Sequence, residues 1–370
     1  MITLQQLSKG LLCNKTQLYG EEKRSRSLRG ALKNPLGQYL LFGLILVVLQ
    51  LVSSLGSEFG IRIIPVSFMT ALGSTLIYSM VSIGFCLLLG YSGLASLGTA
   101  GFIGIGSYCA FFCFQEWGLP YIVAIMMTLA ISIIIGVFVG FISLRIEGIY
   151  LAIITLGLSE ILRYALQTIR ATVNIDLSNI KLFGATIDKE VVFYLIVAVL
   201  LILIWITNNL IKSPTGRAML AMKNSTSAAQ AYGISLMKYR LLAFVLSTVY
   251  AALAGIMYMM YLRSVSTSMS TLFRLTTSLN ILGAVIIGGA KSIWGVLAGT
   301  FIVYGLDSMF LQSIPLFNDN PTLITLFTGI LIILVVMFYP GGLQQLFTLI
   351  RRKVIALAAK RREARYGRDV

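Results

Sequence analysis

The chain has 370 residues, of which 58% are apolar and only 11% are charged, and its formal net charge is +16. A soluble domain of this length does not have that composition, and apolar runs long enough to cross a bilayer recur from Gly37 onward. We therefore expect an all-α fold, that of a polytopic integral membrane protein. Histidine is absent, which removes the commonest general base and metal ligand, so no enzymatic activity, metal site or cofactor is expected.

Basic residues are concentrated in an N-terminal arm at 1–36, a polar interval at 212–240 and a tail at 351–370. Nucleic-acid binding would require basic residues interleaved with aromatic residues on a surface, and this pattern lacks them. An excess of Lys and Arg is typical of the cytoplasmic segments of membrane proteins. The arm, the central loop and the tail are therefore predicted to lie in the cytoplasm, with residues 37–350 forming the transmembrane domain.

About ten apolar segments are expected to cross the membrane as helices. The number of spans before the central loop and the number after it are both even, so both termini and this loop fall on the same side. Glu116 marks a turn on the outer side, and Arg145 and Lys291 mark turns on the inner side. Nine of the expected spans are 37–54, 64–89, 119–144, 148–168, 191–211, 241–262, 272–289, 294–313 and 323–339, and the remaining one, third in order, begins with the glycine tract after residue 89 and ends before Gln115.

The third span begins with the densest glycine tract of the chain, GYSGLASLGTAGFIGIGSY, in which glycines alternate with small hydroxyl residues that include Ser96 and Thr99. Such a tract lets helix backbones approach closely in lipid, which is the favoured interpretation. It also permits a broken or re-entrant segment beside a cavity. A nucleotide-binding loop is not expected, because GFIGIG at 101–106 misses the dinucleotide spacing.

The fifth span is the most polar, with Thr155, Glu160 and Arg163 in YLAIITLGLSEILRY. Glu160 and Arg163 lie three residues apart, so they share a helix face and are expected to pair. Two roles remain open for this pair, a structural salt bridge or a place along a solute path. In the second half of the chain Asn280 and Asp307 are the polar residues inside spans, and each is more typical of a helix–helix hydrogen bond.

The central loop at 212–240 contains five basic residues and no carboxylate. Ser213 followed by Pro214 is a typical helix start, and Asn224 can end that helix. Ser227 and Gln230 have the spacing of a capping box, which predicts a second short helix from Ser227 to about residue 232.

Gly233 followed by Ile234 predicts a left-handed stop for this second helix, and Ser235 can then cap the next span. A short helix fixed between two turns at the cytoplasmic surface is suited to being held by another protein. The plain alternative is a solvated connector.

Five sequence blocks of the chain resemble successive blocks of the high-affinity branched-chain amino acid permeases and follow the same order. These permeases are a family of ABC importer membrane subunits, with urea and simple-sugar permeases as relatives. The resemblance covers about residues 90–343. The blocks are GLASLGTAGFIGIGSY, EGIYLAIITLGLSEILR, SPTGRAMLAMKNSTSAAQAYGISLMKYRLLAF, LGAVIIGGAKSIWGVLAG and FYPGGL.

The resemblance implies a permease in a bacterial inner membrane that pairs with a second, similar permease subunit. It also implies two ATP-binding cassette subunits docked on the central loops and a solute-binding protein that delivers substrate. The residues carried over to the coupling loop are Gly216, Arg217, Ala228, Ala229, Gly233 and Ile234, together with Gln230, which stands where the family commonly has Glu. Candidate residues of the translocation path are Ser96, Thr99, Tyr150, Thr155, Glu160 and Asn280.

The chain departs from the family pattern in two segments. Asn224 to Ser227 precede the Ala-Ala pair where the family usually has acidic residues, so docking here is expected to use shape and hydrogen bonds. ATVNIDLSNIKLFGA replaces the usual Gly-rich, Asn-containing segment after the fifth span, and this outer loop bears on which solute is carried.

The sequence therefore predicts an ABC importer permease that moves a small polar solute, with branched-chain amino acids expected, by alternating access driven by partner ATPases. A permease for urea or simple sugars is an alternative within the same family. A different class remains open, an ion-coupled secondary transporter that uses Glu160 or Asp307.

Overall fold

The computed structural model describes residues 35–58, 65–143, 149–170, 172–174, 181–182, 185–186, 188–266, 274–309, 321–338 and 341–345. The chain divides into two compact units, residues 1–52 and residues 53–370. Residues 1–34 of the basic arm and the whole tail at 351–370 lie outside the described residues. The described part of the first unit belongs to a single apolar helix, α2 (Pro35–Glu58).

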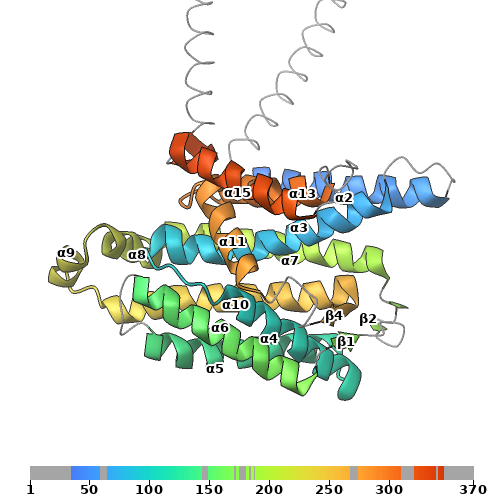
Figure 1. Ribbon diagram of the computed structural model, residues 1–370, viewed down its shortest axis with the longest axis horizontal. Helices are drawn as coiled ribbons and strands as arrows, with labels where there is room; N and C mark the ends of the chain where they lie inside the picture. The colour runs from blue at the N-terminus through green and yellow to red at the C-terminus, as the bar shows by residue number, and fades with distance from the viewer. Residues whose placement is uncertain are drawn as a thin grey trace, which may run out of the picture. The chain divides into compact units, whose positions relative to one another are not determined.

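Helices make up most of the second unit (Figure 1), which agrees with the predicted all-α membrane fold. Helix α3 and helix α4 each continue into a π-helical turn, η1 and η2. In chain order the helices are α3 (Val66–Phe85), η1 (Cys86–Tyr91), α4 (Thr99–Phe111), η2 (Phe112–Glu116), α5 (Tyr121–Ser143), α6 (Ile149–Ile169), α7 (Lys189–Lys212), α8 (Pro214–Asn224), α9 (Thr226–Ala231), α10 (Leu236–Leu262), α11 (Leu275–Gly288), α12 (Ile293–Thr300), η5 (Phe301–Gly305), α13 (Leu306–Met309) and α15 (Pro321–Phe338).

Over the described residues, the expected spans correspond to helices or to runs of consecutive helices, except that residues 92–98 of the third span are not helical. Within the described part of the chain, five are long and apolar enough to cross a membrane: α2, α3 with η1, α5, α7 and α10. Shorter apolar helices lie at 275–288, 293–305 and 326–335. Helix α4 with η2 and helix α6 complete the series. The chain is a polytopic helical membrane protein, and the number of crossings and the side of the termini stay predictions.

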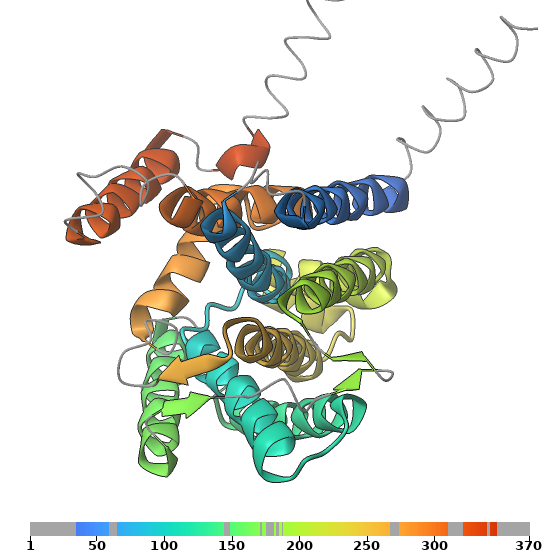
Figure 2. The same cartoon turned by 90° about the vertical axis from the view of Figure 1, so that its right-hand side faces the viewer.

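Helix α10 runs through the middle of the second unit, with α3, α4, α5 and α7 packed around it (Figure 2). The close approach of α10 to α4 depends on two glycines. A Cβ on Gly106 would overlap the carbonyl oxygen of Ala252, and one on Gly255 would overlap that of Ile103. The hydroxyl of Ser107 crosses the same interface and donates to the carbonyl of Gly255 at 3.0 Å. The glycine tract therefore packs two backbones together, as predicted.

The two ends of the second unit differ in character. At one end, β1 (Thr172–Asn174) pairs antiparallel with β4 (Ser264–Ser266), and β2 (Lys181–Leu182) pairs with β3 (Ala185–Thr186). These short strands, in the predicted outer loop and just after α10, are an addition to the expected helices. Arg170 and Glu116 form an ion pair of 2.8 Å at this end.

At the other end lie α8, α9 and the turn that contains Lys291. The hydroxyl of Tyr91 donates to the carbonyl of Lys291 at 3.0 Å, and the ammonium of Lys223 reaches the carbonyl of Gly90. The structure thus places Lys291 with the central loop and away from Glu116, in agreement with the predicted arrangement of the turns.

Candidate functional site

The central loop forms two short helices, α8 and α9, at one end of the second unit (Figure 1). Ser213 caps α8 as predicted, since its hydroxyl oxygen accepts the backbone N–H of Gly216 at 3.3 Å and Pro214 occupies the first turn. Helix α8 ends at Asn224, also as predicted. Gly216 is buried against the carbonyls of Leu210 and Ile211, so it lets α8 leave α7 in a tight turn.

Helix α9 begins differently from the prediction. The cap is Ser225 and not Ser227: the hydroxyl oxygen of Ser225 accepts the backbone N–H of Ala228 at 3.3 Å. Ser225 is the single residue between α8 and α9 and is extended, with φ −157°, which is the backbone geometry of an N-cap. Ser227 then falls within the first turn, so the expected capping box with Gln230 is wrong.

The end of α9 confirms the predicted stop. Gly233 has φ +76°, its N–H donates to the carbonyl of Gln230 at 2.9 Å, and the N–H of Ile234 donates to the carbonyl of Ala229 at 3.0 Å. This pair of bonds is a Schellman motif, in which only glycine adopts the left-handed position at low cost. Helix α9 is therefore fixed at both of its ends.

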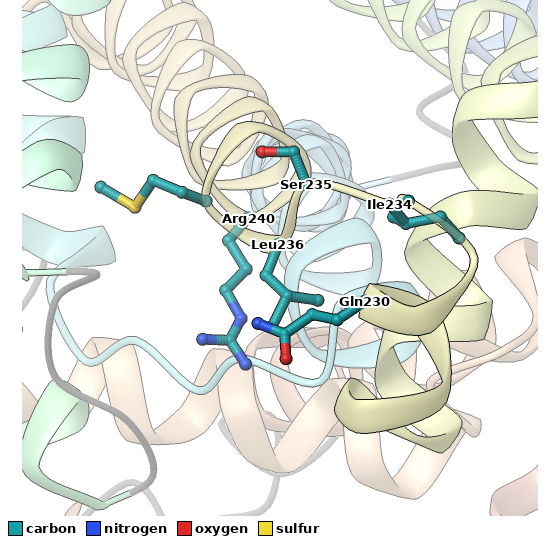
Figure 3. Close-up of a pocket in the computed structure, with 7 residues that line it drawn as sticks. Gln230, Ile234, Ser235, Leu236 and Arg240 are labelled. Atoms are coloured by element: carbon teal, nitrogen blue, oxygen red, sulfur yellow. The ribbon is translucent and has the colours of Figure 1, made fainter.

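An open pocket of about 540 Å³ lies where α9 turns into α10. Gln230 from α9 and Arg240 from α10 extend into the same space (Figure 3), and the lining contains no carboxylate. Arg240 is the charged residue of the lining, so the pocket is basic. The lining residues are Gln230, Gly233, Ile234, Ser235, Leu236, Met237 and Arg240.

The candidate coupling residues divide into a supporting group and an accessible group. Gly216 and Ala229 are buried and hold the loop in shape, and Ile234 is half-buried. The exposed members are Arg217, Ala228, Gln230 and Gly233. Prediction from sequence left out Tyr232, whose side chain is 87% exposed at the end of α9. The sequence feature that could have identified Tyr232 is its position as a large aromatic residue directly before the helix-ending Gly233 in a polar loop.

A non-helical segment, residues 92–98, interrupts the helices between η1 and α4. Its backbone and the first turn of α4 are bonded by side-chain hydroxyls from other helices. Thr155 of α6 accepts from Leu97 N at 3.0 Å. The Oγ of Ser159, also in α6, accepts from Gly101 N at 2.9 Å.

A third helix, α11, contributes to the same arrangement. The Oγ of Ser278 accepts the backbone N–H of Ala100 at 3.1 Å and also lies 3.1 Å from the Thr99 hydroxyl, which donates to it. Irregular backbone inside a membrane bundle is tolerated where protein groups satisfy it in this way. The broken segment was the less favoured interpretation of the glycine tract, and the structure contains both the break and the close packing.

The structure brings three of the candidate path residues together. Ser96, Thr99 and Thr155 are all buried around the broken segment. Ser159 and Ser278 were not predicted as part of this cluster, because neither is marked by its neighbours in sequence.

The remaining path candidates lie apart from that cluster. Tyr150 is 71% exposed on α6, and Asn280 is half-buried on α11. Glu160 pairs with Arg163 as predicted, with Oε2 2.9 Å from Nε. The side chain of Asp307 lies outside the described part of the structure.

The apolar helices, the hydroxyl-lined break and the carboxylate-free loop are those of a multi-pass membrane protein. The family profile described as "Branched-chain amino acid transport system / permease component" matches residues 67–336, and the chain belongs to that family. It is thus a multi-pass inner-membrane protein related to amino-acid transport subunits.

Individual relatives agree with this assignment. The chain is 28% identical over 269 residues to the high-affinity branched-chain amino acid transport system permease protein LivM of Salmonella typhimurium. The aligned region covers 65% of this chain and 61% of that protein. LivM of Escherichia coli is 28% identical over 268 residues, with the same shares. The fructose import permease protein FrcC of Rhizobium meliloti is 31% identical over 227 residues, 56% of this chain and 61% of FrcC. The chain thus spans under two thirds of these relatives, and no solved structure matches it.

Proposed function

We propose that the chain is the membrane-spanning permease subunit of an ABC importer, which moves a small polar solute by alternating access that partner ATPases drive. The observation that carries this proposal is α9, a short helix fixed by Ser225 at its start and by the Schellman motif at its end. A helix held in this way transmits a push from a docked protein as a rigid body. The chain itself performs no chemistry.

The surface around α9 supports docking of an ATP-binding cassette subunit. Tyr232 is an exposed aromatic residue next to the pocket that Gln230 and Arg240 enter. Aromatic residues are common anchors of interfaces, and the loop has no carboxylate that would repel an acidic partner. The ATPase is expected to contribute carboxylate or carbonyl acceptors.

The assembly would contain two ATPases, a second, similar permease subunit and a solute-binding protein on the outer side. Affinity for solute would reside mainly in the binding protein, so the permease path needs only weak polar contacts. The hydroxyl cluster of Ser96, Thr99 and Thr155 provides such contacts, and Tyr150, Glu160 and Asn280 are further candidates.

Branched-chain amino acids are the solutes we propose, on the basis of the names of the family and of the LivM relatives. A simple sugar is the second candidate, because the fructose permease FrcC is also a relative. Direct uptake assays with labelled leucine, isoleucine, valine, fructose and urea distinguish these candidates.

An ion-coupled secondary transporter would need a carboxylate that binds and releases the coupling ion. Glu160 is engaged by Arg163 at 2.9 Å, three residues along the same helix, which fits a structural pair better than an ion site. Glu160→Gln is therefore expected to retain uptake. If Glu160→Gln loses uptake and Glu160→Asp retains it, the result would favour the secondary transporter.

The coupling assignment is tested with two proline substitutions at glycines of positive φ. Gly233→Pro removes the left-handed stop of α9 and the N–H that bonds to Gln230, so uptake should be abolished while the protein still inserts. Gly118 also has a positive φ, of 57°, in the turn between η2 and α5 at the other end, and Gly118→Pro is the matched control. Normal uptake by Gly233→Pro would contradict the assignment.

A further inference from the structure

Lys223, in the last turn of α8, makes a contact that its position in a basic loop does not explain. Its ammonium donates to the carbonyls of Leu89 and Gly90, each at 2.9 Å. These carbonyls belong to the last turn of η1, where carbonyl groups lack partners within the helix and where a cation is favourable. Lys223 thus caps the end of the α3–η1 span from the central loop.

The side chain of Lys223 also lies along the turn that follows η1. Gly93 has φ +75°, and a Cβ at that position would lie 3.1 Å from Cγ of Lys223. On its other side the same turn meets the backbone between α11 and α12, where Gly90 faces the carbonyl of Ala290 and Tyr91 donates to that of Lys291. The turn is therefore held between Lys223 and the α11–α12 connection.

Burial distinguishes Lys223 from three other basic residues of the loop. Lys212, Arg217 and Lys238 are exposed, whereas Lys223 is half-buried. Arg240 is also buried, but it belongs to α10 and lines the pocket beside α9. Burial lowers the pKa of Lys223, and the nearby positive charge of Lys291 lowers it further against a small opposing effect of Cys86. Partial burial of the Lys223 ammonium costs desolvation free energy. This cost is better explained by a specific contact than by a charge that only orients the chain in the membrane.

The contact lies between the two parts of the candidate site. On one side α8 continues through Ser225 to α9, where the ATPase would dock. On the other side the turn at Gly90 and Gly93 leads directly into residues 94–98 and the hydroxyl-bonded start of α4 at Thr99. Lys223 lies in the last turn of α8, and only Asn224 and the cap Ser225 separate it from the start of α9, so a displacement of α9 would act directly on Lys223.

We propose that Lys223 is a positioning residue that transmits movement of the ATPase-docking loop to the broken segment 92–98, through its bonds to the end of η1. This inference rests on the proposed function. It assigns to one side chain the mechanical link between nucleotide-driven motion and the start of the translocation path.

The test measures how nucleotide changes the exposure of the broken segment. Ala95 is half-buried in that segment and is replaced by cysteine in a chain whose native cysteines are serine. Inverted membrane vesicles that contain the complete transporter are treated with a maleimide, without nucleotide and with ATP and vanadate. The labelling rate of residue 95 should differ between the two conditions when Lys223 is present.

Lys223→Met keeps an unbranched apolar side chain and removes the donors, so the nucleotide-dependent change in labelling should be lost. Lys223→Arg keeps the charge and the donors and should restore at least part of the change. Lys238→Met removes an exposed charge from the same loop and should leave the change intact. If Lys223→Met does not accumulate in the membrane, Lys223→Gln, whose amide is too short to span both carbonyls, makes the same comparison.

The outcomes separate the two proposals. A nucleotide-dependent change that is equal in the Lys223→Met and unsubstituted chains would overturn the role of Lys223 and leave the proposed function standing. Labelling that ignores nucleotide in every variant, including the unsubstituted one, would overturn both.

Discussion

Thr155 of α6 and Leu97 of the broken segment are joined by a hydrogen bond in which the Leu97 N–H donates to Oγ1 of Thr155 at 3.0 Å. The same hydroxyl donates to the carbonyl of Leu151 at 3.0 Å, one turn earlier in α6. Thr155 is fully buried, so a protein side chain takes the place that water would take at a surface. The non-helical segment 92–98 is therefore stabilised by a hydrogen bond to another helix of the bundle.

Replacing Thr155 with valine should destabilise the protein, because valine has the same shape but leaves the N–H of Leu97 without its acceptor. A buried unsatisfied amide costs about 1–3 kcal/mol. Thr155→Ser keeps the hydroxyl and is the matched control. The apparent melting temperature in detergent measures both, and a Thr155→Val protein as stable as the unsubstituted one would show that this bond does not hold the segment.

Two glycine-to-alanine substitutions should have opposite effects on stability. Gly106→Ala places a Cβ against the Ala252 carbonyl of α10, and such overpacking costs about 1–3 kcal/mol. A Cβ at Gly157 of α6 would meet no atom within 4 Å, so Gly157→Ala should be neutral or stabilise the helix by up to about 1 kcal/mol. The melting temperatures should move apart, and equal shifts would contradict close contact between α4 and α10.

Features governed by local rules were predictable from the sequence. Ser213 with Pro214, the end of α8 at Asn224, the stop at Gly233 and the pair of Glu160 with Arg163 depend on residues a few positions apart. The cap of α9 was misplaced because two serines, at 225 and 227, both suited it. The choice between the two serines depends on the length of the link between α8 and α9. The spacing of residues alone does not give that length.

Contacts between distant helices could not be predicted in the same way. The bond from Leu97 to Thr155 joins residues 58 apart, the one from Ala100 to Ser278 joins residues 178 apart, and Lys223 lies 133 residues from Gly90. A single sequence shows which residues are polar but not which of them meet. The contacts of Ser159, Ser278 and Lys223 are therefore visible only in the structure.

Tyr232 should contribute to docking of the ATPase, because its side chain is 87% exposed beside the pocket at the end of α9. Tyr232→Ala is expected to weaken association of the purified ATPase by about 2 kcal/mol, the usual scale for an aromatic anchor. Trp117 is 58% exposed in a turn at the opposite end, and Trp117→Ala is the control. Binding measured in detergent should fall only for Tyr232→Ala; unchanged binding would exclude this residue from the interface.

The lowered pKa of Lys223 predicts a dependence of stability on pH. Between that lowered pKa and the ordinary value of 10.5, the folded chain binds fewer protons at this residue than the unfolded chain does, so stability rises with pH in this window. Lys223→Met lacks the titrating group. The melting temperature of the unsubstituted protein should therefore rise relative to that of Lys223→Met as the pH approaches 10.5 from below. A constant difference would contradict the burial of this ammonium.

The central claim is that separate ATPases drive solute through this chain, and uptake by proteoliposomes tests it most directly. Vesicles with the complete transporter and its binding protein receive either ATP at the cytoplasmic face without an ion gradient, or a proton or sodium gradient without ATP. We expect accumulation of labelled solute with ATP alone and none with the gradient alone. Accumulation by this chain without its partners, driven only by an ion gradient, would contradict the account.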